Sequence, residues 1–94
     1  MAEHPGYAAS KQQLRNRVRR IEGQVRGVTR MVDEERYCID VLAQITAVQR
    51  ALDRVALELV SDHTRECVVG ATGDKQEERT DELLTAIDRL VSRR

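Results

Sequence analysis

The feature that most constrains the fold of this 94-residue chain is its segment from Cys38 to Val69, which contains neither glycine nor proline. Apolar residues recur every three or four positions along it, the spacing that places side chains on one face of an α-helix. The segment therefore predicts one long amphipathic helix. Its apolar seam repeats every ~3.5 residues and consists of Val41, Ile45, Val48, Leu52, Val55 and Leu59. Such a seam is typical of helices in antiparallel bundles.

Two further helices are predicted, one on either side of this segment. The first is expected to run from an N-cap at Ser10 to about Glu35, where a short turn over 35–37 follows. Its apolar residues also form a heptad repeat: Leu14, Val18, Ile21, Val25, Val28 and Val32. The last helix is expected to begin between Asp74 and Thr80, after a glycine-containing break. It is expected to bury Leu83, Leu84, Ile87, Leu90 and Val91.

The composition agrees with an all-α fold, because 34% of the residues are charged and the chain has one proline and no Phe or Trp. Aliphatic side chains must then form the core, and a chain of this length can build only a small one. We therefore expect a three-helix protomer that assembles with other copies of itself. A flexible N-terminal arm is expected over residues 1–9, and a single helical domain over 10–94.

The chain shows no sequence signal for a membrane or for secretion. No segment has the ~20 consecutive apolar residues that cross a bilayer. The first ten residues, MAEHPGYAAS, lack the basic start and apolar core of a signal peptide. We therefore expect a cytoplasmic protein whose cysteines stay reduced.

Positive charge is concentrated near the start of the chain, although the formal net charge is zero. Residues 11–30 contain one acidic residue, Glu22, and seven basic ones: Lys11, Arg15, Arg17, Arg19, Arg20, Arg26 and Arg30. Arg50 and Arg54 add to this charge from the long central helix. A solvated helix face is the alternative, but the scarcity of acidic neighbours favours a surface that binds a polyanion such as DNA. No helix-turn-helix pattern is present, so DNA shape and backbone would carry much of the recognition.

Cys38, His63 and Cys67 share one face of the long helix. At ~100° per residue, His63 lies about 20° to one side of Cys38 and Cys67 about 20° to the other. At ~1.5 Å per residue, however, Cys38 and His63 are roughly 37 Å apart. A second copy of the helix, running antiparallel, would bring its Cys38 to His63 and Cys67. Two thiolates and one imidazole suit Cu(I), whereas Zn(II) would want a fourth ligand.

Two other interpretations of these residues remain open. Cysteines are often simply small buried apolar residues, and a helical histidine is often structural. A catalytic Cys–His pair is a further option. Nothing in the sequence supplies an oxyanion hole or an orienting third group, so we expect neither an enzyme nor a small-molecule substrate.

The motifs IEGQVRG and YCIDVL, together with the H-x-x-x-C spacing, resemble the CsoR/RcnR family of bacterial metal- and stress-sensing repressors. The resemblance extends from about Leu14 to Leu90. It implies a dimer that forms an antiparallel four-helix bundle, and a tetramer that is a dimer of dimers and binds operator DNA. It also implies DNA contacts by Arg17 and Arg54, with Arg15, Arg19 and Arg20 as supporting candidates.

Within that family, the set Cys38, His63 and Cys67 resembles the Cu(I)-responsive branch. The resemblance implies that Tyr37 and Glu82 support the metal ligands and transmit binding. The nickel/cobalt branch has His in place of Cys67 and a further His ligand near the N-terminus. His4 of this chain is offset from that position, which Gly6 would occupy. The formaldehyde branch typically lacks the second cysteine, and the persulfide branch lacks the histidine.

The sequence therefore predicts a Cu(I)-responsive transcriptional repressor, whose apo tetramer binds the operators of copper-resistance genes and releases them when Cu(I) binds. One alternative is a repressor of the same fold whose thiols sense persulfide or another electrophile. The other is a helical copper buffer that does not bind DNA.

Overall fold

The computed structural model describes residues 5–92, and three α-helices make up most of them: α1 (Lys11–Asp33), α2 (Cys38–His63) and α3 (Gly73–Ser92). Two short segments adjoin these helices. A 3₁₀ turn, η1 (Ala8–Ser10), precedes α1, and a π-helix, η2 (Thr64–Val69), follows α2. The described residues contain no strand, which confirms the predicted all-α, three-helix protomer. None of the helices in this part of the chain is long and apolar enough to cross a membrane.

Contacts divide the described residues into two compact units, one formed by residues 10–57 and the other by residues 5–9 together with 58–92. The single domain expected over 10–94 stays a prediction. His4, which the family resemblance compared with a ligand of the nickel/cobalt branch, lies outside the described residues.

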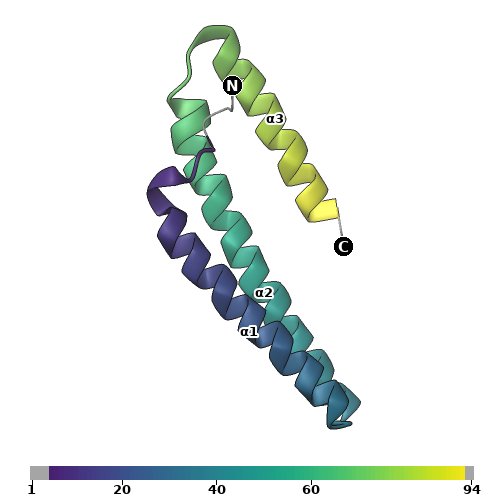
Figure 1. The fold of residues 1–94 in the computed structure, drawn as a ribbon. Helices are drawn as coiled ribbons and strands as arrows, with labels where there is room; N and C mark the ends of the chain where they lie inside the picture. Colours follow the sequence, from purple (N-terminus) through teal and green to yellow (C-terminus); the bar gives the residue numbers. More distant parts are fainter. Residues whose placement is uncertain (1–4, 93–94) are drawn as a thin grey trace. The chain divides into compact units, whose positions relative to one another are not determined.

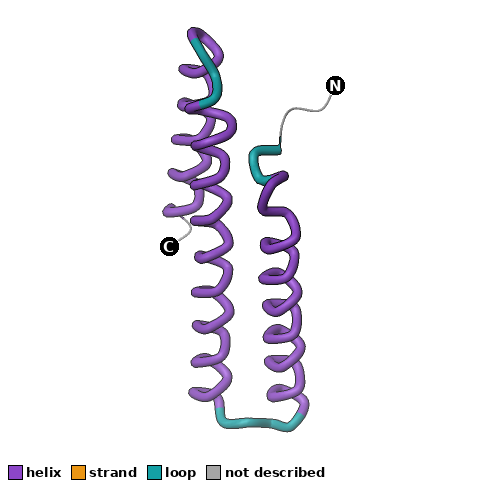
Figure 2. Tube along the Cα trace, turned by 90° about the vertical axis from the view of Figure 1, so that its left-hand side faces the viewer, coloured by secondary structure: helices purple, strands orange, loops and turns teal. Residues whose placement is uncertain are grey.

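In the unit formed by residues 10–57, α1 and the first part of α2 lie side by side and antiparallel (Figures 1 and 2). The turn between them occupies residues 34–37, close to the predicted position. Glu35 has a positive φ of 54°, and two bonds close the helix end: Glu35 N to the Val32 carbonyl at 3.0 Å and Arg36 N to the Met31 carbonyl at 2.9 Å. This is the Schellman arrangement, here with a glutamate where glycine is usual.

The two apolar seams of this unit each divide into an inward and an outward row. The inward rows of α1 and α2 consist of Leu14, Ile21, Val28, Val41, Val48 and Val55, all buried or half-buried. The core forms where Leu14 and Ile21, each 6% exposed, meet Val55, which is 9% exposed. The outward rows consist of Val18, Val25, Val32, Ile45 and Leu52, which are 38–59% exposed. The chain's own packing therefore covers only half of the predicted stripes.

In the unit formed by residues 5–9 and 58–92, the last turns of α2 change from α- to π-helical hydrogen bonding. The predicted continuous α-helix to Val69 is wrong from Thr64 onward. The Thr64 hydroxyl donates to the Val60 carbonyl at 2.7 Å, a bond that competes with regular helix bonding. At the far end, a Cβ on Gly70 would lie 2.8 Å from the Glu66 carbonyl oxygen, so only glycine fits this turn.

Helix α3 packs against η2 and begins at Gly73, one residue before the predicted interval. The Gln76 side chain donates from Nε2 to the Val68 carbonyl at 3.2 Å, which supplies a partner at the end of η2. None of the five apolar residues predicted to be buried is fully buried. Leu84 and Val91 remain 58% and 65% exposed. Their burial, like that of the outward rows, requires contacts beyond the single chain.

Candidate metal site and arginine pocket

His63 and Cys67 lie together at the junction of α2 and η2. His63 is the last residue of α2, and Cys67 is buried within η2 at 9% exposure. Both face the backbone of Gly6 in the N-terminal arm: a Cβ built on Gly6 would be 3.3 Å from the Cys67 Sγ and 3.3 Å from the His63 Nδ1. The thiol and the imidazole nitrogen therefore approach the same point. The structure brings together these two of the three predicted ligands.

The third predicted ligand, Cys38, is the first residue of α2 and is exposed. Both cysteines are thiols rather than members of a disulfide. Among residues 5–92, no three or more His, Cys, Asp or Glu side chains form a group that could hold a metal ion. The described chain thus supplies a donor pair, formed by half-buried His63 and buried Cys67, and an accessible thiol at Cys38.

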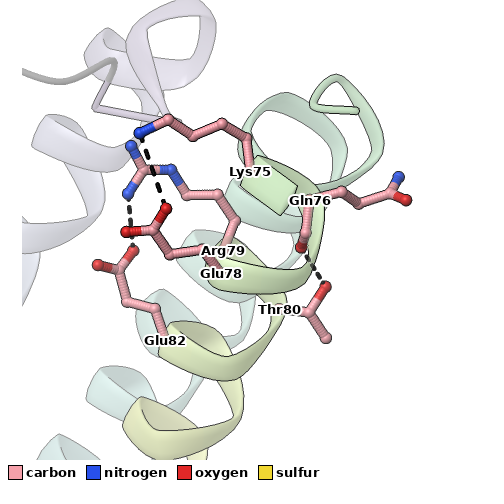
Figure 3. Close-up of polar contacts among 6 residues, drawn as sticks. All are labelled: Lys75, Gln76, Glu78, Arg79, Thr80 and Glu82. Atoms are coloured by element: carbon pink, nitrogen blue, oxygen red, sulfur yellow. Dashed lines mark hydrogen bonds and ion pairs between the residues drawn. The ribbon is translucent and has the colours of Figure 1, made fainter. Parts of the chain in front are cut away.

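Glu82, predicted to support the metal ligands, shares a pocket with His63. This pocket has a volume of about 260 Å³ and is lined mainly by apolar side chains: Pro5, Tyr7, Leu59, Val60, His63, Glu82, Leu83 and Ala86. The Glu82 carboxylate is paired with Arg79, whose Nη1 lies 3.4 Å from Oε1 on the preceding turn of α3 (Figure 3). Glu82 and His63 therefore line the same pocket, and a cation lies beside the Glu82 carboxylate.

Tyr37, the other predicted supporting residue, has a different setting. It precedes the first turn of α2, where its carbonyl accepts hydrogen bonds from the N–H groups of Asp40 and Val41 at 3.0 and 3.2 Å. Its side chain is 69% exposed. Tyr37 thus lies next to Cys38, in the unit formed by residues 10–57.

A neighbouring pocket of about 380 Å³ opens beside Cys67, and Lys75 and Arg79 are among its lining residues. The Arg79 side chain is only 17% exposed. It lines the pocket beside Cys67 and is paired with Glu82, which lines the pocket that contains His63. Arg79 is not among the site residues predicted from the sequence. Its one available signal was the i, i+3 spacing to Glu82, which favours side-chain pairing on a helix.

Four arginines from α1 and α2 surround a pocket of about 330 Å³ in the unit formed by residues 10–57. Its lining residues are Arg17, Arg20, Ile21, Gln24, Arg50, Ala51 and Arg54. Helical spacing explains the grouping, since positions three, four and seven apart share one face of α1. Three of the five predicted DNA contacts, Arg17, Arg20 and Arg54, therefore gather here.

Arg15 and Arg19, the other two predicted DNA contacts, are exposed and do not line this pocket. Gln24, which the sequence analysis did not select, does line it. Its side-chain oxygen is buried and has no hydrogen-bond partner within the described residues. Guanidinium groups match phosphate oxygens in two parallel hydrogen bonds. A concave surface with four of them suits a phosphate backbone.

The chain resembles characterised regulators over most of its length. A family model described as metal-sensitive transcriptional repressor matches residues 10–89. The copper-sensing transcriptional repressor RicR of Mycobacterium tuberculosis is 47% identical over 89 residues, which cover 92% of this chain and 93% of that protein. The solved structure of the copper-sensing repressor CsoR with Cu(I) from Geobacillus thermodenitrificans has 38% identity and a TM-score of 0.80, covering 97% of this chain and 94% of that one. The nickel-responsive transcriptional regulator InrS has 49% identity and a TM-score of 0.72, covering 83% and 89%. The chain therefore belongs to the family of metal-sensitive transcriptional repressors.

Proposed function

We propose that this chain is a Cu(I)-responsive transcriptional repressor that acts in the cytoplasm and catalyses no reaction. In the metal-free state its arginine pocket binds operator DNA, and Cu(I) binding weakens that complex. The observation that carries the proposal is the pairing of His63 with buried Cys67 at one end of α2, while Cys38 stands exposed at the other.

The donor set fits Cu(I). Thiolates are soft ligands, and imidazole also serves copper. Cys38 would come from a second copy of the chain, because a continuous helix separates it from His63. The outward rows of α1 and α2 supply an apolar surface for that second copy, and a two-fold axis would create two equivalent sites per dimer. A tetramer built from two such dimers is part of the same proposal.

Metal and DNA binding are coupled through the assembly. A site shared by two chains fixes their relative arrangement when it fills, and the arrangement sets how the arginine pockets meet DNA. By linkage, Cu(I) weakens DNA binding by the same free energy with which DNA weakens Cu(I) binding, typically about 1–3 kcal/mol. Glu82 shares a pocket with His63, and in this proposal its carboxylate would accept a hydrogen bond from the imidazole, the support that metal-bound histidines usually have.

Fluorescence anisotropy of a labelled duplex tests the proposal directly. The duplex is one that the apo protein selects from a random-sequence library, and Cu(I) is added without oxygen. We expect its affinity to fall by roughly 5–150-fold, the range that such coupling spans. Cys38→Ala should bind the duplex but no longer respond to Cu(I), whereas Ser61→Ala, a change outside the donor set, should respond normally. Unchanged affinity of the natural chain on copper loading would refute the proposal.

Nickel is a second candidate effector, because the nickel-responsive regulator InrS is 49% identical to this chain. The donor set argues for copper, since it contains two thiolates and a single histidine. The same anisotropy titration with Ni(II) separates the two. A larger loss of DNA affinity with Ni(II) than with Cu(I) would reassign the effector.

Two other functions would give different results. Persulfide sensing predicts a Cys38–Cys67 crosslink between two chains after persulfide treatment, which mass spectrometry detects. A copper buffer would bind Cu(I) without binding any duplex. The arginine pocket disfavours the buffer, because storing copper requires no such surface.

A further inference from the structure

Gln24 has an unsatisfied side chain inside the arginine pocket. It lines this pocket from α1, and its side-chain oxygen is buried and accepts no hydrogen bond within the described residues. A buried acceptor without a donor lowers the stability of the folded chain, and most buried polar atoms of folded proteins have a partner. The isolated chain therefore keeps a side chain that destabilises it, which indicates that Gln24 serves another state of the protein.

The chemistry of DNA limits what can satisfy this oxygen. Phosphate oxygens accept hydrogen bonds, so they cannot donate one to Gln24. The donors at hand are the guanidinium groups of the pocket, each of which carries five N–H groups. One guanidinium can therefore bond a phosphate and the Gln24 oxygen at the same time.

Arg50 is the best-placed donor. Val55 meets Leu14 and Ile21 in the core, and α2 runs antiparallel to α1 (Figures 1 and 2). Arg50 precedes Val55 in α2, so it lies further along α1, toward Gln24. Side chains on a helix lean toward the N-terminus of their own helix. In this antiparallel pair, Gln24 therefore leans toward Arg50, and Arg50 leans toward Gln24.

Charge explains why this bond is absent from the isolated chain. Arg50 is exposed there, and four guanidinium groups around one pocket repel one another. A phosphate between them offsets the repulsion and draws Arg50 inward. The torsion that turns the Gln24 amide is broad, so the oxygen can face the incoming guanidinium without any change in the backbone.

We propose that Gln24 is a positioning residue for DNA binding, whose side-chain oxygen accepts a hydrogen bond from Arg50 when DNA occupies the pocket. The bond holds the Arg50 guanidinium against a phosphate, so Arg50 becomes a DNA contact in addition to those predicted from the sequence. This inference rests on the proposed function of the arginine pocket. It implies opposite effects of one side chain, since Gln24 destabilises the isolated chain and strengthens its complex with DNA.

The first test is Gln24→Met, which removes the acceptor but keeps the length and the helix propensity of the side chain. Thermal denaturation should show a midpoint raised by at least about 4 °C, because an unsatisfied buried group is lost. Anisotropy with the labelled duplex that the apo protein selects should show an affinity at least about tenfold lower, because a hydrogen bond to a charged group is lost.

Gln44→Met is the matched control. It makes the same change at an exposed position of α2 outside the pocket, and should alter neither the midpoint nor the DNA affinity. A residue needed only for folding would give a lower midpoint when substituted. That result for Gln24→Met, or an unchanged DNA affinity, would overturn the inference.

A double-mutant cycle identifies the donor. In an Arg50→Ala background, Gln24→Met should lower the DNA affinity by less than about twofold, because the guanidinium that it positions is already gone. In an Arg15→Ala background, which alters an arginine outside the pocket, it should keep its full effect of about tenfold. Equal losses in the two backgrounds would show that the Gln24 oxygen serves another donor, and would contradict the proposal.

The natural chain separates this inference from the proposed function. If it binds no duplex, the arginine pocket is not a DNA surface and both proposals are wrong. If it binds the duplex and Gln24→Met binds equally tightly, only the role of Gln24 is wrong.

Discussion

Leu52 offers a quantitative test of whether the outward rows are covered by a second copy of the chain. Its side chain is 49% exposed in the single chain. Burying a whole leucine side chain contributes roughly 1.5–3 kcal/mol, so covering the remaining half contributes about 1 kcal/mol. A two-fold interface contains the residue twice, so Leu52→Ala should cost a dimer about 2 kcal/mol. This corresponds to a rise of about 30-fold in the dimer Kd.

Sedimentation velocity over a dilution series measures that Kd. Two controls use the same helix. Val55→Ala alters the inward row, where the side chain is 9% exposed, and should lower the thermal midpoint at every protein concentration. Gln49→Ala changes an exposed polar residue and should leave both quantities unaltered. If Leu52→Ala dimerises as tightly as the natural chain, the reasoning that assigns the outward rows to a partner copy is wrong.

Three further variants test other parts of the structure. Gly70→Ala should lower the free energy of unfolding by about 1–3 kcal/mol, because its Cβ would lie 2.8 Å from the Glu66 carbonyl oxygen. Thermal denaturation measures this loss, and an unchanged stability would contradict the described turn. Glu35→Gly should raise the free energy of unfolding by up to about 1 kcal/mol, since glycine relieves the strain of the positive φ at a small entropic cost. A less stable variant would contradict this expectation. Arg54→Ala should lower DNA affinity for all sequences and reduce the slope of log affinity against log salt concentration by about one. Arg15→Ala, which changes an arginine outside the pocket, should reduce this slope less. Equal effects of the two arginine variants would reject the pocket as the DNA surface.

The sequence predicted the helices well because their signals are periodic and local. The heptad seams of α1 and α2 follow directly from side-chain spacing, and α1 begins directly after the predicted N-cap, Ser10. Spacing alone did not reveal that alternate members of each seam, such as Leu14 and Val18, face different surroundings. That division depends on how two helices pack, which a pattern along one helix does not specify.

The candidate site was predicted in part. The four-residue spacing of His63 and Cys67 correctly predicted that both project from neighbouring turns, although the turn between them is π-helical. A glycine-free apolar run does not distinguish a π-helical turn from an α-helical one, and the Thr64 hydroxyl bond recurs at Thr46 and Thr80 within regular α-helices. The family resemblance placed Gly6 at the N-terminal ligand position of the nickel/cobalt branch. Its contact with Cys67 was not predicted, because the arm lacks periodicity and the contact joins residues far apart in the sequence.

The position of Gly6 has a practical consequence for anyone who purifies this protein. The backbone of Gly6 borders the Cys67 Sγ and the His63 Nδ1, so groups attached to the chain shortly ahead of Gly6 remain near both atoms. A polyhistidine tag fused a few residues before Gly6 would therefore place a string of imidazoles within easy reach of His63 and Cys67. Metal affinities measured on such a fusion would include the tag's own ligands. A tag at the other end, or one removed by cleavage, is the sound choice for every titration described above.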